Sequence, residues 1–269
     1  MIERWALDHT RVQRAVIGGI ASLAVWELIG RLIGTPLLLP WPSYIVSVSF
    51  PSLALFGGGA EPDAWLATTT VLSNLGITIS RISIGLMVGI IWGIALGVGA
   101  SSLGRMCSRG SLLLVILRSF PLFSLIPLFV YWFAGNETGV WSYIAFSTLI
   151  VVATGVYQAI TNVPKVFLLQ AKLLGASPSK RIFTIIFPAV VPELIATFRN
   201  VLGLSWAFSL GAEYTGSHNG LGYLVYLSYT YADMGKLATL ASIYCIGGLV
   251  VFFIWNRCIA NAGFWAKTT

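Results

Sequence analysis

Charged residues are scarce in this chain, and their scarcity excludes a water-soluble globular protein. Only 9% of the 269 residues are Asp, Glu, Lys or Arg, whereas 57% are hydrophobic; soluble surfaces carry about 25–35% charged residues. Apolar runs of the length that crosses a bilayer as a helix, roughly 20 residues, recur along the chain. The short alternating segments of a transmembrane barrel are absent from the sequence. We therefore expect an all-α, polytopic membrane protein with a single domain over residues 1–269.

Groups that perform chemistry or bind metals are also sparse. Cys107, Cys245 and Cys258 lack the spacing of a disulfide framework or zinc site, and only two histidines are present. The only Gly-Lys pair, Gly235-Lys236, is not part of a phosphate-binding loop. A nucleophile with its acid and base cannot be assembled from so few candidates. We expect no catalytic residue, no metal site and no cofactor bound by the chain itself.

Six apolar runs predict about six transmembrane helices. They cover residues 15–34, 71–100, 111–133, 139–160, 189–211 and 237–255. The first run is longer than the apolar region of a signal peptide and is not followed closely by a cleavage site, so we expect a retained helix. Residues 36–66 are expected to form an interfacial segment outside the membrane, and residues 212–236 an external loop.

Lys and Arg are divided unevenly among the connecting segments. If the N-terminus is cytoplasmic, most of the 16 cations fall in cytoplasmic segments, including Arg105 and Arg109, whereas the opposite loops are mainly acidic. Because positive charge is retained on the cytoplasmic side, both termini are expected to be cytoplasmic. This topology accounts for the net charge of +7, so no nucleic acid partner is needed to explain it.

One cytoplasmic interruption, residues 161–187, has the pattern of two short helices around a tight turn. Pro164 can open a first amphipathic helix, and Gly175 can supply the left-handed backbone conformation that ends it. Ser177 can cap a second helix, which we expect to end where Pro188 resets the backbone. The pattern fits both an interfacial hairpin that anchors the loop and a docking element for a cytoplasmic partner.

The stretch LQAKLLGASPSKRIFTIIFPAVVP in this interruption resembles a known loop motif. The motif belongs to permease subunits of bacterial binding-protein-dependent ABC importers and reads E-A-A, three residues, Gly, nine residues, I-x-L-P. Ala171, Gly175, Ile185 and Pro188 match it. Leu169 replaces its acidic residue, Gln170 its first alanine and Phe187 its leucine. In that family the loop fits a groove on the ATPase subunit. The resemblance implies ATPase-coupling contacts at Gln170, Ala171, Gly175, Ala176, Ser177 and Pro188.

Further segments resemble the nitrate, sulfonate and taurine branch of these permeases. They are LLLPWPS at 37–43, SRISIGLMVGIIWGIALGVGAS at 80–101, LRSFPLFSLIPLFVYWFAGNET at 117–138 and LGLSWAFSLGAEYTGSHNGLGYLV at 202–225. The resemblance implies a type I ABC importer permease fold in the bacterial inner membrane, and a pathway for a small anionic solute such as nitrate, sulfonate, taurine or bicarbonate. It also implies partners: a second copy of the chain, two cytoplasmic ATPases that bind ATP and Mg, and a periplasmic or lipid-anchored binding protein.

The third apolar run is one candidate for the translocation pathway. A broken backbone is tolerated in lipid only where protein or a cavity covers it, and this run contains two prolines. Its candidate pathway residues are Arg118, Phe120, Pro121 and Ser124. A packing kink, with the arginine reaching to the membrane surface, explains the pattern equally well.

The fifth run supplies the other pathway candidates, Trp206, Ser209 and Glu213. Trp206 is as compatible with packing against a neighbouring helix as with facing a pore. Glu213 precedes a loop rich in turn-forming residues, so hydrogen bonding that orders this loop is favoured over direct substrate contact. Two further arginines within spans, Arg81 and Arg199, are expected to stabilise the bundle and not to bind substrate.

A secondary transporter or channel without an ATPase partner is the alternative function. Such a protein would be expected to show internal repeats or ion-coupling carboxylates at mid-membrane, and the sequence shows neither. A non-transporting membrane subunit would explain the hydrophobicity but not the spacing from Gly175 to Pro188.

Overall fold

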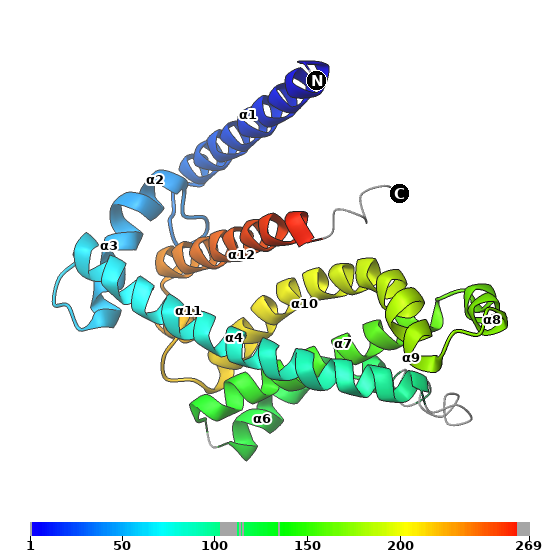
Figure 1. The fold of residues 1–269 in the computed structure, drawn as a ribbon. Helices are drawn as coiled ribbons and strands as arrows, with labels where there is room; N and C mark the ends of the chain where they lie inside the picture. The colour runs from blue at the N-terminus through cyan, green and yellow to red at the C-terminus, as the bar shows by residue number, and fades with distance from the viewer. Residues whose placement is uncertain (1, 103–111, 113, 115, 134, 263–269) are drawn as a thin grey trace. The chain divides into compact units, whose positions relative to one another are not determined.

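The computed structural model describes residues 2–102, 112, 114, 116–133 and 135–262, and every element in these ranges is a helix. Within them five helices, which can be followed along the chain in Figure 1, are long and apolar enough to cross a membrane. They lie at Val16–Ile33, Ala64–Ser101, Glu137–Thr161, Ile182–Gly216 and Met234–Arg257. The predicted all-α, polytopic architecture is confirmed. The loop cations Arg105 and Arg109 lie outside the described residues.

The chain divides into two compact units. The first comprises Met1–Ser73 and Leu224–Tyr244, and the second comprises Asn74–Tyr223 and Cys245–Thr269. Three helices, α4 (Ala64–Ser102), α11 (Leu221–Thr230) and α12 (Met234–Ala262), therefore contribute one part to each unit.

The first unit begins with α1 (Ile2–Ile33), which is followed by a short apolar helical run. The run consists of α2 (Pro42–Tyr44), the π-helix η1 (Ile45–Ser49), α3 (Phe50–Ser52) and the 3-10 helix η2 (Leu53–Gly57). The Glu27 carboxylate of α1 accepts hydrogen bonds from the backbone N–H of Ser43 at 2.9 Å and from its hydroxyl at 2.7 Å. The same carboxylate pairs with Arg31 at 2.6 Å. Glu27 therefore fastens the start of the run to α1.

The second unit is built around α7 (Glu137–Thr161), the most buried of the long helices. The helix α10 (Phe187–Gly216) lies beside it, as Figure 1 shows. On α4, four glycines spaced four residues apart face α7: Gly85, Gly89, Gly93 and Gly97. A Cβ atom at any of them would lie 2.6 to 2.7 Å from an atom of α7. The regular glycines of this segment therefore allow the two helix backbones to approach closely.

The segment that precedes α10 is continuous with it. The helix α9 (Pro178–Arg181), the π-helix η5 (Ile182–Ile186) and α10 follow one another without a break. The prediction that the second loop helix ends at Pro188 is therefore wrong. Proline lacks an N–H and its ring clashes with the carbonyl four residues earlier, and the wider π-turn ahead of Pro188 accommodates both defects.

The third apolar run does not form one long helix in the part that the structure describes. Residues 116–119 are helical and Phe120 lies in a bend. The 3-10 helix η4 (Leu122–Leu125) and the short α6 (Ile126–Trp132) follow. Pro121 separates the two parts because its ψ of 94° is extended. Each of the other five predicted runs coincides with a long helix, and only the first, 15–34, extends one residue past the end of its helix.

The segment 212–236 contains a helix in addition to turns. α10 ends at Gly216, the ten-residue α11 begins at Leu221, and α12 begins at Met234. Gly220, immediately before α11, has a φ of +93°, a conformation that favours glycine.

Candidate functional site

The interruption between α7 and α10 folds as a helix–turn–helix, as the sequence predicts. Its first helix, α8, covers Lys165–Leu173, with Pro164 at the N-cap. The N–H of Ala176 donates to the carbonyl of Ala171 at 2.9 Å, and the N–H of Gly175 donates to that of Lys172 at 3.1 Å. With a φ of +75° at Gly175, these bonds form the glycine-dependent motif that commonly ends helices.

The second helix of this loop begins with the predicted cap. The hydroxyl of Ser177 accepts a hydrogen bond from the backbone N–H of Lys180 at 3.3 Å, and α9 starts at the intervening Pro178. The turn between the two helices is therefore held by the hydrogen bonds that end α8 on one side and by the Ser177 cap of α9 on the other.

The tip of this loop is apolar and exposed. Leu173 and Leu174 are each 87% exposed, more than any other large hydrophobic residue in the described part of the chain. Beside them is an open groove of about 520 Å³ between α8 and the start of α10. Of the predicted coupling residues, Gln170, Ala171 and Pro188 line it. An exposed apolar surface of this kind is typical of an interaction site.

The opposite end of the second unit holds a buried ionic cluster centred on Arg81. Its guanidinium pairs with Glu137 at 2.6 Å and with Glu213 at 2.8 Å, and it also donates to Asn219. The side chains of Arg81 and Glu213 are 3% and 0% exposed, whereas that of Glu137 is 55% exposed. This cluster joins α4, the start of α7 and the end of α10. These contacts support the expectation that Arg81 stabilises the bundle.

Glu213 also orders the turn before α11. It accepts hydrogen bonds from the backbone N–H of Gly222 and from the hydroxyl of Thr78, both at 2.9 Å. Thr78 in turn accepts from the N–H of Leu221 at 3.0 Å. The carboxylate thus lies at the N-terminal end of α11, where free N–H groups and the helix dipole favour negative charge. These contacts support the loop-ordering interpretation of Glu213 over direct substrate contact.

The sequence did not identify Arg81, Glu137, Thr78 and Asn219 as one cluster. The available signal was a single arginine within a span, together with acidic residues at two span ends. Intramembrane arginines require a partner, but the partners here are separated by more than 50 residues along the chain.

The other predicted pathway residues are not brought together around one polar cavity. Arg118, Phe120, Pro121 and Ser124 are exposed, and the Ser124 hydroxyl donates to the carbonyl of Pro121 at 2.7 Å. Phe120 borders a depression of about 370 Å³ whose other lining residues are also hydrophobic. They are Leu117, Leu125, Leu128, Phe129, Trp132, Phe146 and Ile150.

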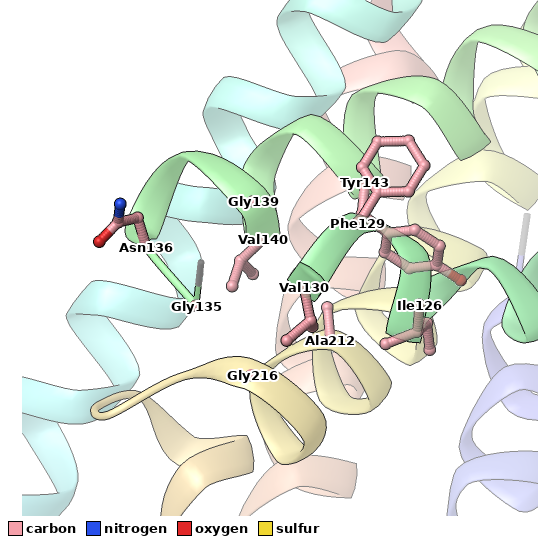
Figure 2. Close-up of a pocket in the computed structure, with 10 residues that line it drawn as sticks. All are labelled: Ile126, Phe129, Val130, Gly135, Asn136, Gly139, Val140, Tyr143, Ala212 and Gly216. Carbon is pink, nitrogen blue, oxygen red and sulfur yellow. The ribbon is translucent and has the colours of Figure 1, made fainter. Parts of the chain in front are cut away.

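The broken segment nevertheless packs firmly onto its neighbours. Figure 2 shows residues of α6, α7 and α10 around a small cavity, with Ile126 and Val130 turned toward Ala212. Its volume is only about 10 Å³, which is at the lower limit for one water molecule. The hydroxyl of Tyr143 on α7 donates to the carbonyl of Leu122 at 3.1 Å. This cavity is a packing feature and not a ligand site.

Trp206 packs against α12. A Cβ atom at Gly247 or Gly248 would lie 2.7 or 3.2 Å from its indole ring. Ser209, one turn further along α10, is buried. The structure therefore favours helix packing for Trp206, one of the two alternatives that the sequence left open.

Apolar spanning helices and an exposed apolar loop at one end are features of a membrane-embedded protein with an interaction surface. Residues 85–260 match the family described as binding-protein-dependent transport system inner membrane component, and the chain belongs to this family. It is a transporter component of the inner membrane.

Curated relatives agree with the family. The chain is 28% identical to the taurine transport system permease protein TauC of Escherichia coli, over 82% of this chain and 78% of the relative. It is 26% identical to the putative aliphatic sulfonates transport permease protein SsuC of Bacillus subtilis (87% and 78%). It is 23% identical to the nitrate import permease protein NrtB of Synechococcus elongatus (90% and 85%). The predicted branch is confirmed by these relatives.

Solved structures support the fold. An inward-facing structure of the MetNI methionine ABC transporter aligns with a TM-score of 0.59 at 16% identity, over 71% of this chain and 93% of that one. A crystal structure of an amino acid ABC transporter with histidines aligns with a TM-score of 0.60 at 18% identity, over 78% and 99%. The type I importer permease fold is confirmed.

Proposed function

We propose that this chain forms, with a second copy of itself, the translocation pathway of an ATP-driven importer for a small anionic solute. Two ATPase subunits, which bind ATP and Mg, dock on the cytoplasmic loop 161–187. A periplasmic or lipid-anchored binding protein delivers the solute from the other side. Taurine, sulfonate and nitrate appear in the names of three of the chain's relatives, and these names support the anionic solute class. Another relative, ThiX of Halalkalibacterium halodurans, is named for formylaminopyrimidine.

The exposed tip of the helix–turn–helix carries this proposal. Leu173 and Leu174 would be costly to leave in water, and the positive charges of Lys165, Lys172 and Lys180 around them suit a cytoplasmic location. The left-handed Gly175 and the Ser177 cap fix the shape of the loop before any partner binds, which lowers the entropic cost of docking.

In this arrangement both termini are cytoplasmic. Gln170, Ala171, Gly175, Ala176, Ser177 and Pro188 form or support the ATPase contact. ATP drives a conformational change only to the extent that the ATPases favour one permease conformation over the other.

The test is copurification of ATPase activity with the tagged chain, extracted from its native membrane in mild detergent. We expect Leu174→Asp to reduce the copurifying activity by about tenfold or more, since it places a charge at the centre of an apolar contact. Leu38→Asp is the matched control because Leu38 is also strongly exposed but lies in the segment assigned to the other side of the membrane.

Two results would contradict the proposal. One is the absence of any ATP-hydrolysing subunit from preparations of the unmodified chain. The other is full copurifying ATPase activity in the Leu174→Asp variant, which would show that the loop tip is not the contact with the ATPase.

A further inference from the structure

Arg81 and Arg199, which both lie within spanning helices of the second unit, have different surroundings. Arg81 is buried and bound by two carboxylates. Arg199, on α10, is exposed and forms no hydrogen bond or ion pair with any residue that the structure describes. Its contact is with the aromatic ring of Phe252 on α12, whose centroid lies 5.9 Å from the guanidinium carbon. Arg81 therefore has charged partners within the bundle, whereas the described contact of Arg199 is with an aromatic ring.

Arg199 lies inside the candidate span of α10. It is the central residue of the 35-residue span Ile182–Gly216. At about 1.5 Å per residue, its Cα lies about 25 Å from either end, and the hydrocarbon core is about 30 Å thick. A core that lies within this span therefore includes the Cα of Arg199, at least about 5 Å from either edge of the core. Charged side chains inside the core almost always face the bundle interior or a water-filled cavity.

Arg199 borders an open groove of about 430 Å³. The groove is lined by Ala196, Arg199, Asn200, Gly203, Leu204 and Phe252. Ala196 and Gly203 leave room beside the guanidinium because their side chains are small or absent. The exposed amide of Asn200 lies next to it in sequence and lines the same groove. The volume falls within the range of small-molecule sites, about 300–1,000 Å³.

The groove suits an oxyanion. A guanidinium presents a planar fork of N–H donors that matches the oxygens of carboxylate, sulfonate or nitrate groups, and the Asn200 side-chain amide adds N–H donors. The Phe252 ring beside the guanidinium restricts its orientation and stabilises the charge.

A carboxylate of a second copy is a weaker candidate for this site. The described acidic side chains are bonded to other groups or lie in the turn before α4. They are Glu27 with Ser43, Asp63 with the first turn of α4, Glu137 and Glu213 with Arg81, Glu193 with Asn162, Asp233 with Lys236, and Glu61 in the turn. A second copy would bring these same groups, so it offers no free acid at the depth of Arg199 from the described residues.

We propose that Arg199 and Asn200 bind the transported oxyanion in the groove between α10 and α12. This site rests on the proposed importer function and adds to it a position in the membrane and a ligand class. Arg199 and Asn200 bind the anionic group of the solute, and the rest of the solute does not contribute to this contact.

Charge-selective labelling tests the site in the assembled permease–ATPase complex. The three native cysteines are replaced by serine, and Ala196→Cys places a thiol in the groove. Two methanethiosulfonate reagents are compared, one bearing a sulfonate and one bearing a trimethylammonium group. We expect the anionic reagent to react about tenfold faster than the cationic one, and sodium nitrate or taurine at high concentration to slow it.

Arg199→Gln in the same background is expected to abolish this preference. Arg257→Gln, at another exposed arginine of a spanning helix, is the matched control and should leave the preference unchanged. Equal rates for the two reagents before the Arg199 change would overturn the site. The site would also be overturned if neither reagent modified the Ala196→Cys thiol in a complex that still hydrolyses ATP.

A different outcome would assign Arg199 to a protein contact. If Arg199→Gln separates the two permease copies during size-exclusion chromatography, whereas Arg257→Gln does not, the guanidinium binds a group of the partner and the proposal is overturned. Copurification of the ATPase with the unmodified chain reports on the importer function independently, so failure of the site and failure of the function are distinguishable.

Discussion

Arg81 is the residue on which the polar contacts of the second unit converge. Its single positive charge is shared between the carboxylates of Glu213 and Glu137, and Glu213 in turn accepts a hydrogen bond from the N–H of Gly222 at the start of α11. Removal of the guanidinium would leave a buried carboxylate without its counter-ion, which is more damaging than loss of the pair itself.

We therefore expect Arg81→Ala to destabilise the chain by about 3–5 kcal/mol. Arg31→Ala removes an arginine that also pairs with a glutamate, but its side chain is 62% exposed, and the expected cost is below about 1 kcal/mol. Thermal unfolding of the two purified variants in the same detergent measures the difference. Similar unfolding midpoints would show that the buried cluster adds no stability.

The contact between α4 and α7 depends on the absence of side chains. A Cβ atom at Gly89 would lie 2.6 Å from both the carbonyl oxygen of Ala145 and the Cβ of Thr148. A backbone atom cannot move aside as a flexible side chain can, so the helices would have to separate.

Gly89→Ala is expected to destabilise the chain by about 1–3 kcal/mol because the contact becomes overpacked. Gly76→Ala, on the same helix, meets nothing within 4 Å and should stabilise it by about 0.5–1 kcal/mol through the higher helix propensity of alanine. Unfolding midpoints of the two variants should therefore shift in opposite directions. If the unfolding midpoints of both variants shifted in the same direction, close packing at Gly89 would be contradicted.

Turns and helix caps, which depend on residues adjacent in the sequence, were predictable from the sequence. Gly175 and Ser177 stand in the positions that a turn between two helices needs, and the structure has that turn. The predicted helix end at Pro188 was wrong. A proline usually ends a helix, but here the π-helix Ile182–Ile186 accommodates it and the helix continues. The Arg81 cluster and the free Arg199 were beyond prediction, since both depend on which helices lie side by side and not on neighbouring residues.

For the whole molecule, the number of membrane crossings decides where the termini lie. Both termini are cytoplasmic only if the chain crosses an even number of times, and five long helices are described. If both termini are cytoplasmic, as proposed, the interrupted run 111–133 completes a sixth crossing, with Pro121 at the break between its described parts.

A protease-cleavable tag at each terminus tests this arrangement. We expect both tags to be cleaved in inverted membrane vesicles and both to be protected in intact spheroplasts. Protection of one tag and cleavage of the other in the same preparation would mean an odd number of crossings, and the broken run would then enter and leave on one side.

The unbroken helix from Pro178 to Gly216 has a mechanical consequence. At 1.5 Å per residue its path is about 58 Å long, and Figure 1 shows that this path is curved. An element of this length that pivots about one end by about 10° moves its other end by up to roughly 10 Å, so a small tilt imposed near Ser177 is magnified at Glu213. Arg199, about halfway along, would travel about half as far. A movement of the loop can thus reach the groove and the turn before α11 through one continuous helix, whose points of bending are the π-turn beside Pro188 and Pro192.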